Sequence, residues 1–273
     1  MTDDDQPGTS ERRGSRFDRI AERWLRGPLA LLEGVGEIAI MGAQVAYWMM
    51  RPPYRPRVFL DAFYFVGVGS VFIILLVASF MGGVIALQSI SGFADFDAEN
   101  MTGGVIGLSF TRELAPVFTA LMLTARAGAA MTTELGTMRV TDQIDALTTM
   151  GINPIQYLVA PRVVASTAMA PVLCYLFNVV GMVGAYGVAV GLMNLDPGIF
   201  IDEMAWAVDT DDVLGGMLKA TVLGYFVSLI ACRQGFYARG GAAGVGVATT
   251  RAVVHSFVTV FILDYFLTDL IRG

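Results

Sequence analysis

The sequence predicts an all-α integral membrane protein. An N-terminal amphipathic helix is expected to lie at the membrane interface, about five helices to cross the bilayer, and a short helix to occupy a cytoplasmic loop. Hydrophobic residues make up 55% of the 273 residues, charged residues 15%, and the mean hydropathy is +0.62. Soluble chains of this length carry far more charge, so this composition indicates a membrane protein. The net charge of -6, without a basic stripe, argues against nucleic-acid binding.

The chain opens with an acidic, polar segment. Residues 1–23 lack the basic start and short apolar core of a signal peptide, and they are expected to form a disordered cytoplasmic tail. Residues 24–57 are predicted to hold the interfacial helix and a linker. Glu33 and Glu37 lie one turn apart on a largely apolar segment. This polar stripe favours a helix in the interface plane, with a membrane span as the alternative.

Five apolar runs within residues 58–273, the predicted transmembrane domain, are long enough to cross a bilayer, which takes about 20 residues. The first and third runs contain no charged residue, and the others contain a few ionisable groups each. The five predicted spans are Ala62–Ile90, Gly103–Ala125, Val163–Leu195, Val213–Cys232 and Val245–Leu267.

The charges of the loops alternate along the chain and predict its orientation. Many arginines precede the first span, whereas the loop after it carries Asp95, Asp97 and Glu99 without a basic residue. Arginines return in the next loop, acidic residues fill 196–212, and arginines follow the fourth span. The positive-inside rule therefore predicts a cytoplasmic N-terminus and a C-terminus on the outer face of the membrane.

The loop between the second and third spans is predicted to form a helix at about 137–149. Thr137 or Thr141 can cap its start, and Gly151 with Pro154 can end it. Such a helix would expose an apolar stripe, which could dock a partner domain or rest on lipid headgroups. The stripe consists of Val140, Ile144 and Leu147.

Three charged residues lie inside predicted spans at similar depths. Arg112 and Glu113 belong to the second span and Lys219 to the fourth. A charge within a bilayer is costly unless it is paired or faces water. These residues are therefore predicted either to line a cavity, where the two cations could hold an anion such as a phosphate, or to form a structural ion pair. Arg251 in the fifth span is a further cavity candidate that could instead reach the interface.

The sequence shows no catalytic or metal site. Cys174, Cys232 and His255 are too few for a metal cluster. Lys219 is the only lysine, and the residues before it do not form a Walker A loop. If the protein transports a substrate, the energy would then come from another chain or from an ion gradient. In the second case the protein would be an ion-coupled carrier that uses Glu113, His255 and Asp264.

Five motifs in a fixed order resemble the MlaE/YrbE family of permeases, and the resemblance extends from about Trp24 to the C-terminus. Two departures are mild: the family pattern favours a larger apolar residue than Ala127, and more often Glu than Asp142. The motifs are 112–116 (RELAP), 125–129 (ARAGA), 134–141 (ELGTMRVT), 143–147 (QIDAL) and 157–162 (YLVAPR).

The resemblance implies a homodimeric permease of the bacterial inner membrane that moves phospholipid or another lipid between the inner and outer membranes. A separate ABC ATPase would bind ATP and Mg²⁺, so this chain needs no cofactor of its own. A periplasmic MCE-domain protein, usually hexameric, and a small STAS-type regulatory subunit are further implied partners. The cytoplasmic helix would be a coupling helix in a groove of the ATPase. The coupling residues would be Glu134, Thr137, Arg139, Thr141, Asp142, Ile144, Asp145 and Leu147.

Overall fold

A computed structural model describes residues 34, 36–51 and 55–272. The chain divides into two compact units, residues 1–41 and 42–273. The described residues of the first unit are helical, and the helix continues to residue 49 in the second. The predicted tail at 1–23 lies outside the described residues, and so do residues 24–33, 35 and 52–54 of the predicted interfacial segment. The interfacial position of that segment stays a prediction.

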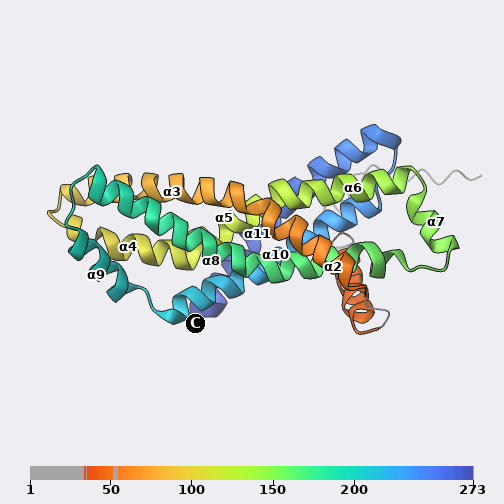
Figure 1. Ribbon diagram of the computed structural model, residues 1–273, viewed down its shortest axis with the longest axis horizontal. Helices are drawn as coiled ribbons and strands as arrows, with labels where there is room; N and C mark the ends of the chain where they lie inside the picture. The colour runs from red at the N-terminus through yellow and green to blue at the C-terminus, as the bar shows by residue number, and fades with distance from the viewer. Residues whose placement is uncertain (1–33, 35, 52–54, 273) are drawn as a thin grey trace, which may run out of the picture. The chain divides into compact units, whose positions relative to one another are not determined.

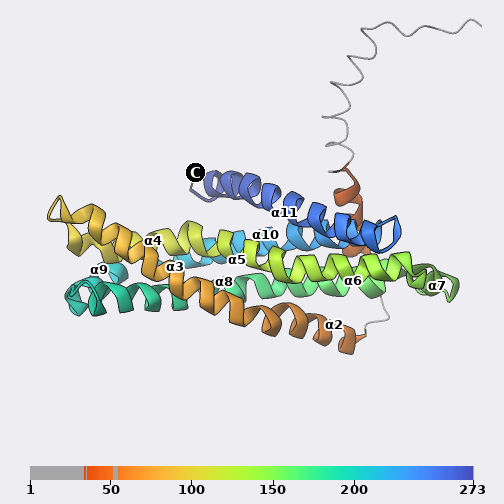
Figure 2. The same cartoon turned by 90° about the horizontal axis from the view of Figure 1, so that it is seen from above.

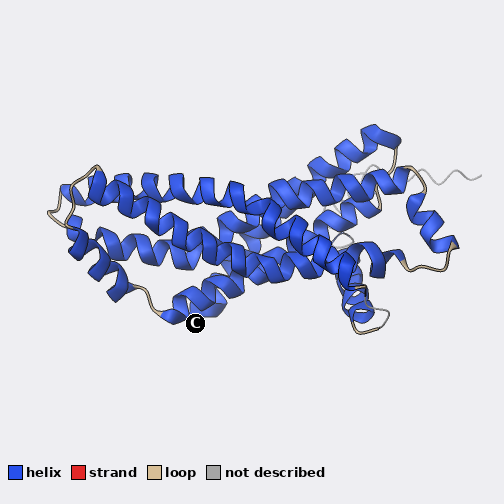
Figure 3. Ribbon diagram, in the orientation of Figure 1, coloured by secondary structure: helices blue, strands red, loops and turns tan. Residues whose placement is uncertain are grey.

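The described part of the second unit contains helices and no strand, which confirms the predicted fold class (Figure 3). Several helices follow one another without a break through single π-helical turns (η1, η3, η4), whereas the π-helical turn η5 and the 3-10 turn η2 lead from a loop into α8 and α4. The elements are α2 (Pro56–Phe63), η1 (Tyr64–Val68), α3 (Gly69–Ala94), η2 (Glu99–Met101), α4 (Thr102–Ser109), η3 (Phe110–Leu114), α5 (Ala115–Leu123), η4 (Thr124–Gly128), α6 (Ala129–Val140), α7 (Gln143–Thr149), η5 (Ile155–Val159), α8 (Ala160–Gly191), α9 (Pro197–Ala207), α10 (Thr210–Phe236) and α11 (Gly241–Arg272).

Five continuous helices are long and apolar enough to cross a membrane, as the sequence predicted. All five are longer than their predicted spans. A helix of 39 residues, such as the first, is about 58 Å long, well beyond a hydrocarbon core of about 30 Å. These helices therefore extend past the bilayer. The five are Pro56–Ala94, Glu99–Val140, Ile155–Gly191, Thr210–Phe236 and Gly241–Ile271.

The two ends of this helical bundle carry different short helices. α7 lies at one end, and α4 and α9 lie at the other, beside the turn between α3 and α4 (Figures 1 and 2). Since the arginine-rich loops belong to the α7 end, the predicted orientation places α7 in the cytoplasm and α9 on the outer side.

Helix α9 was not predicted, because its acidic surroundings resemble a loop. Asp196 caps it by accepting hydrogen bonds from the backbone nitrogens of Gly198 (2.8 Å) and Ile199 (3.0 Å). Phe200 is fully buried, and its ring lies 6.0 Å from that of Tyr186 on α8. This aromatic contact attaches α9 to α8, and close packing at Gly103 and Gly104 holds α9 against α4.

Small residues allow α3 and α8 to approach each other closely. A Cβ atom at Gly82 of α3 would overlap the carbonyl oxygen of Gly181 on α8, and a Cβ atom at Gly184 would contact the backbone of Ser79. Close backbone approach at small residues is the usual way in which membrane helices pack. The first and third spans therefore form a tight pair.

Candidate functional site

Lys219 stands at the centre of a cluster of charged residues from three spans. Only 3% of it is exposed, and its ammonium group donates to Glu113 Oε2 (2.9 Å), the carbonyl of Arg112 (3.0 Å) and Thr268 Oγ1 (2.7 Å). Asp264 Oδ1 lies 3.6 Å away. These three hydrogen bonds use all the protons of the ammonium group. The cluster thus joins η3, α10 and α11.

A proline explains why the carbonyl of Arg112 is available to Lys219. In a regular helix this oxygen would accept a bond from the backbone nitrogen four residues later, but that residue is Pro116, which has no N–H. The helix widens into the π-helical turn η3 just before Pro116. A carbonyl freed in this way within a membrane needs another donor, and Lys219 supplies it.

The side chain of Arg112 pairs with the first turn of α10. Its Nε atom donates to Asp212 Oδ1 at 2.6 Å. Asp212 also completes a capping box, because its Oδ2 atom accepts from the backbone nitrogen of Asp209 at 3.2 Å. Through Asp212, the start of α10 is attached to η3.

These side chains border a cavity of about 350 Å³. Arg112 and Lys219 face three carboxylates in its wall, so no excess of positive charge exists in this conformation. Arg112 is 36% exposed and uses Nε for its ion pair with Asp212. The acidic wall residues are Glu113, Asp211 and Asp212.

Close packing at Gly216 brings Lys219 to η3. A Cβ atom at Gly216 would overlap the carbonyl oxygen of Thr111, so α10 contacts the second span backbone to backbone at this position. Lys219 follows three residues later on the same face of α10. Glycine at 216 is therefore a condition for the Lys219–Glu113 contact.

Arg112, Glu113 and Lys219, which were predicted to lie at one depth, all line one cavity in the structure. Arg251 is not part of it, since it lies thirteen residues before Asp264 on α11, roughly 20 Å along the helix. His255 lies four residues after Arg251 on α11 and contacts Gln234 (3.1 Å), not the charged cluster. The proton relay of the alternative carrier is thus not assembled in this conformation.

The sequence analysis did not assign Asp212 and Thr268 to the site. Asp212 could have been found from its spacing of three residues from Asp209, which is typical of a capping box. Thr268 follows Asp264 by four residues and so lies on the same face of α11. Their side-chain partners, however, depend on the rotation of α10 and α11.

A second candidate region surrounds α6 and α7. Glu134 of α6 forms a 2.8 Å ion pair with Arg162 of α8, and Arg139 at the end of α6 forms a 2.6 Å pair with Asp145 of α7. The first pair attaches α6 to α8. The second pair links α6 to α7 across the corner between them.

The predicted helix at about 137–149 is two helices in the structure. Thr137 lies inside α6, and the chain turns at Asp142, whose backbone is left-handed (φ 58°), before α7 begins. Ile144 of the apolar stripe is buried, and Leu147 is half-buried. Thr141, Asp142 and Asp145 are exposed. The accessible surface of α7 is therefore polar, whereas its apolar stripe faces the protein.

The chain is similar to known membrane transport proteins over most of its length. The family described as Permease MlaE matches residues 59–270. A probable ABC transporter permease protein of Rickettsia typhi is 38% identical, over 88% of this chain and 92% of the relative. The intermembrane phospholipid transport system permease protein MlaE of Haemophilus influenzae is 39% identical, over 76% and 80%. The chloroplastic protein TRIGALACTOSYLDIACYLGLYCEROL 1 of Arabidopsis thaliana is 35% identical, over 85% and 66%.

Proposed function

Because this chain belongs to the MlaE permease family, we propose that it is the transmembrane subunit of an ABC transporter that moves phospholipid or a related lipid between the inner and outer membranes. A relative of this family is named for phospholipid transport, which supports the cargo class. The chain is a membrane permease with no enzymatic role of its own in this proposal. ATP hydrolysis, with its ATP and Mg²⁺, belongs to a separate ATPase subunit.

The observation that carries the proposal is the charged cavity beside η3. In our proposal a lipid headgroup enters it, and its phosphate displaces Asp212 from Arg112, whose guanidinium group offers bidentate geometry. Lys219 becomes a second phosphate partner when Glu113 turns away from it. In this proposal Arg251 contributes to a separate part of the lipid path, outside the cavity, where α11 contacts α6.

The proposed partners occupy opposite ends of the permease dimer. The ATPase binds the polar surface of α7, and the coupling residues at its centre are Thr141, Asp142 and Asp145. A periplasmic MCE-domain protein, expected to be a hexamer, covers the α4–α9 end. A small STAS-type subunit would regulate the assembly.

We expect the N-terminus and α7 in the cytoplasm, and α9 and the C-terminus in the periplasm. Single cysteines at Thr149 and Arg239 should resist an impermeant thiol reagent added to intact cells, whereas cysteines at Asp95 and Asp211 should react. All four positions are exposed. The native Cys174 and Cys232 are buried, so background labelling of the native cysteines should be low. Labelling of the Thr149 site from outside would show that the orientation is reversed.

Arg112→Gln should lower crosslinking of a photoreactive phospholipid to the permease about ten-fold, the effect expected for one charge-assisted hydrogen bond to phosphate. Arg239→Gln is the matched control, because this exposed arginine lies outside the cavity and outside the proposed lipid path. Assembly with the ATPase should persist in both variants. If Arg112→Gln instead lowers permease abundance and leaves crosslinking per molecule unchanged, Arg112 serves only as a structural ion pair.

A further inference from the structure

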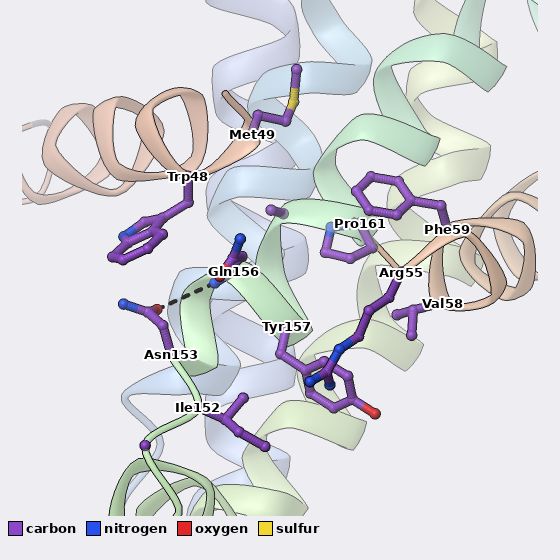
Figure 4. A pocket seen from close by; sticks show the side chains of 12 residues that line it. Trp48, Met49, Arg55, Val58, Phe59, Ile152, Asn153, Gln156, Tyr157 and Pro161 are labelled. Atoms are coloured by element: carbon purple, nitrogen blue, oxygen red, sulfur yellow. Dashed lines mark hydrogen bonds between the residues drawn. The ribbon is translucent and has the colours of Figure 1, made fainter. Parts of the chain in front are cut away.

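A second cavity, of about 150 Å³, lies where the first and third candidate spans begin (Figure 4). Its walls come from the end of the helix at 42–49, from the start of α2, and from the connection between α7 and α8. It shares no lining residue with the cavity at Lys219. It is therefore a separate site, at the α7 end of the bundle.

The charge of this cavity is positive. Arg55 lines it, no carboxylate does, and Arg55 forms no ion pair with any residue within 34, 36–51 and 55–272. The guanidinium group stacks on the ring of Tyr157, 4.9 Å from its centroid (Figure 4). This stacking holds the cation in place while its hydrogen-bond donors stay available to an anion.

A polar contact fixes the two walls beside Arg55. The side-chain amide of Gln156 donates to the carbonyl of Arg51 at 2.9 Å, which joins the start of η5 to the segment before α2. Asn153 caps η5, since its oxygen accepts from the backbone nitrogens of Ile155 (2.9 Å) and Gln156 (3.3 Å). Its amide nitrogen then points away from η5, on the Trp48 side of the cavity (Figure 4).

The remaining walls are apolar and lie at the start of the first candidate span. Trp48, Phe59 and Pro161 line the cavity, and Arg55 directly precedes Pro56, the first residue of the first candidate span. A cation at the end of a span, with tryptophan and tyrosine beside it, is typical of the headgroup region. A free anion would gain nothing from the apolar walls, whereas a lipid would use both surfaces.

We propose that this cavity binds an anionic phospholipid of the adjoining leaflet, with its phosphate at Arg55 and its glycerol and upper acyl segments against Phe59 and Val58. The volume suits a headgroup with part of the glycerol, so the acyl chains continue along the outside of α2. The lipid would touch Gly151, Ile152 and Asn153, which link α7 to η5. Its binding therefore stabilises the base of the proposed coupling helix.

The test uses the purified full-length chain in nanodiscs of phosphatidylcholine mixed with phosphatidylglycerol, and native mass spectrometry of the lipids retained after extraction. The wild type should retain phosphatidylglycerol in preference. Arg55→Gln should lower this retention about ten-fold. The matched control is Arg57→Gln, an exposed arginine outside the cavity, which should stay within about two-fold. Ile152→Trp, which fills the cavity without changing charge, should also lower retention.

Three results would overturn the proposal. Equal losses in Arg55→Gln and Arg57→Gln would indicate diffuse attraction to a basic surface. Unchanged retention in Ile152→Trp would show that the lipid lies elsewhere. Release of phosphatidylglycerol by excess inorganic phosphate would identify a phosphate site instead of a lipid site. The assay measures binding to the permease alone, so its result is independent of transport and of the ATPase.

Discussion

Lys219→Met should be the most destabilising single substitution in the charged cluster. It removes the cation that Glu113 and Asp264 share, and it removes the donor for the Arg112 carbonyl that Pro116 leaves open. Loss of one partner from a buried ion pair costs roughly 3–5 kcal/mol. The side chain of Glu113 is 34% exposed, so the lower part of that range is expected. Denaturant titration of the purified permease in lipid bicelles measures the change.

Compensating substitutions separate the charge effect from packing. The triple variant Lys219→Met, Glu113→Gln and Asp264→Asn removes all three charges and should recover most of the lost stability, because neutral amides are cheaper to bury than carboxylates. Arg251→Met is the control on an exposed part of α11 and should change stability little. A triple variant as unstable as Lys219→Met would mean that the lysine acts through packing or through its bond to the Arg112 carbonyl, and not through its ion pairs.

The second large effect is expected at α7. Asp142→Arg combined with Asp145→Arg should abolish co-purification of the ATPase while permease abundance stays unchanged. Both aspartates are exposed, and Asp145→Arg places a second cation beside Arg139. Repulsion or a steric clash at an interface is costly, whereas exposed positions contribute little to folding. Affinity purification followed by quantification of both subunits provides the measurement.

The opposite end of the bundle offers a matched control for that experiment. Asp97 has the same left-handed backbone as Asp142, with φ of 53° against 58°. Asp95→Arg with Asp97→Arg therefore imposes the same charge change and a similar backbone strain far from α7. ATPase co-purification should survive in this variant. Equal loss in both double variants would mean that the effect comes from net charge or folding, and α7 would lose its assignment as the docking helix.

The transmembrane part of the fold could be predicted because long uncharged apolar runs seldom occur outside membrane spans. The runs beginning at Ala62 and Val163 form spans as predicted. The first helix extends beyond both predicted ends, whereas the third begins eight residues early and ends at Gly191, before the predicted Leu195. The predicted spans stop where charges or polar residues begin, but a helix that leaves the bilayer can continue through them. α9 was missed for the same reason, since its buried Phe200 is surrounded by acidic residues.

The site could be predicted in part. Counting residues from the span ends placed Arg112, Glu113 and Lys219 at one depth, and depth does not depend on how each helix is rotated. The pairing of Arg112 with Asp212 does depend on rotation, and so does the approach of α10 at Gly216. The break between α6 and α7 at Asp142 could not be predicted from the hydrophobic periodicity. In the sequence, an aspartate with a left-handed backbone cannot be distinguished from an acidic residue in the first turn of a helix.

Asp212 gives Arg112 an internal competitor. Any anion that binds this arginine must exchange places with a carboxylate that the protein itself supplies at 2.6 Å. The net affinity is therefore a difference between two similar charge-assisted bonds. When the anion departs, Asp212 returns to the arginine and no bare cation remains in the wall. Such exchange favours rapid release over tight retention, as a conduit requires of the species that pass through it.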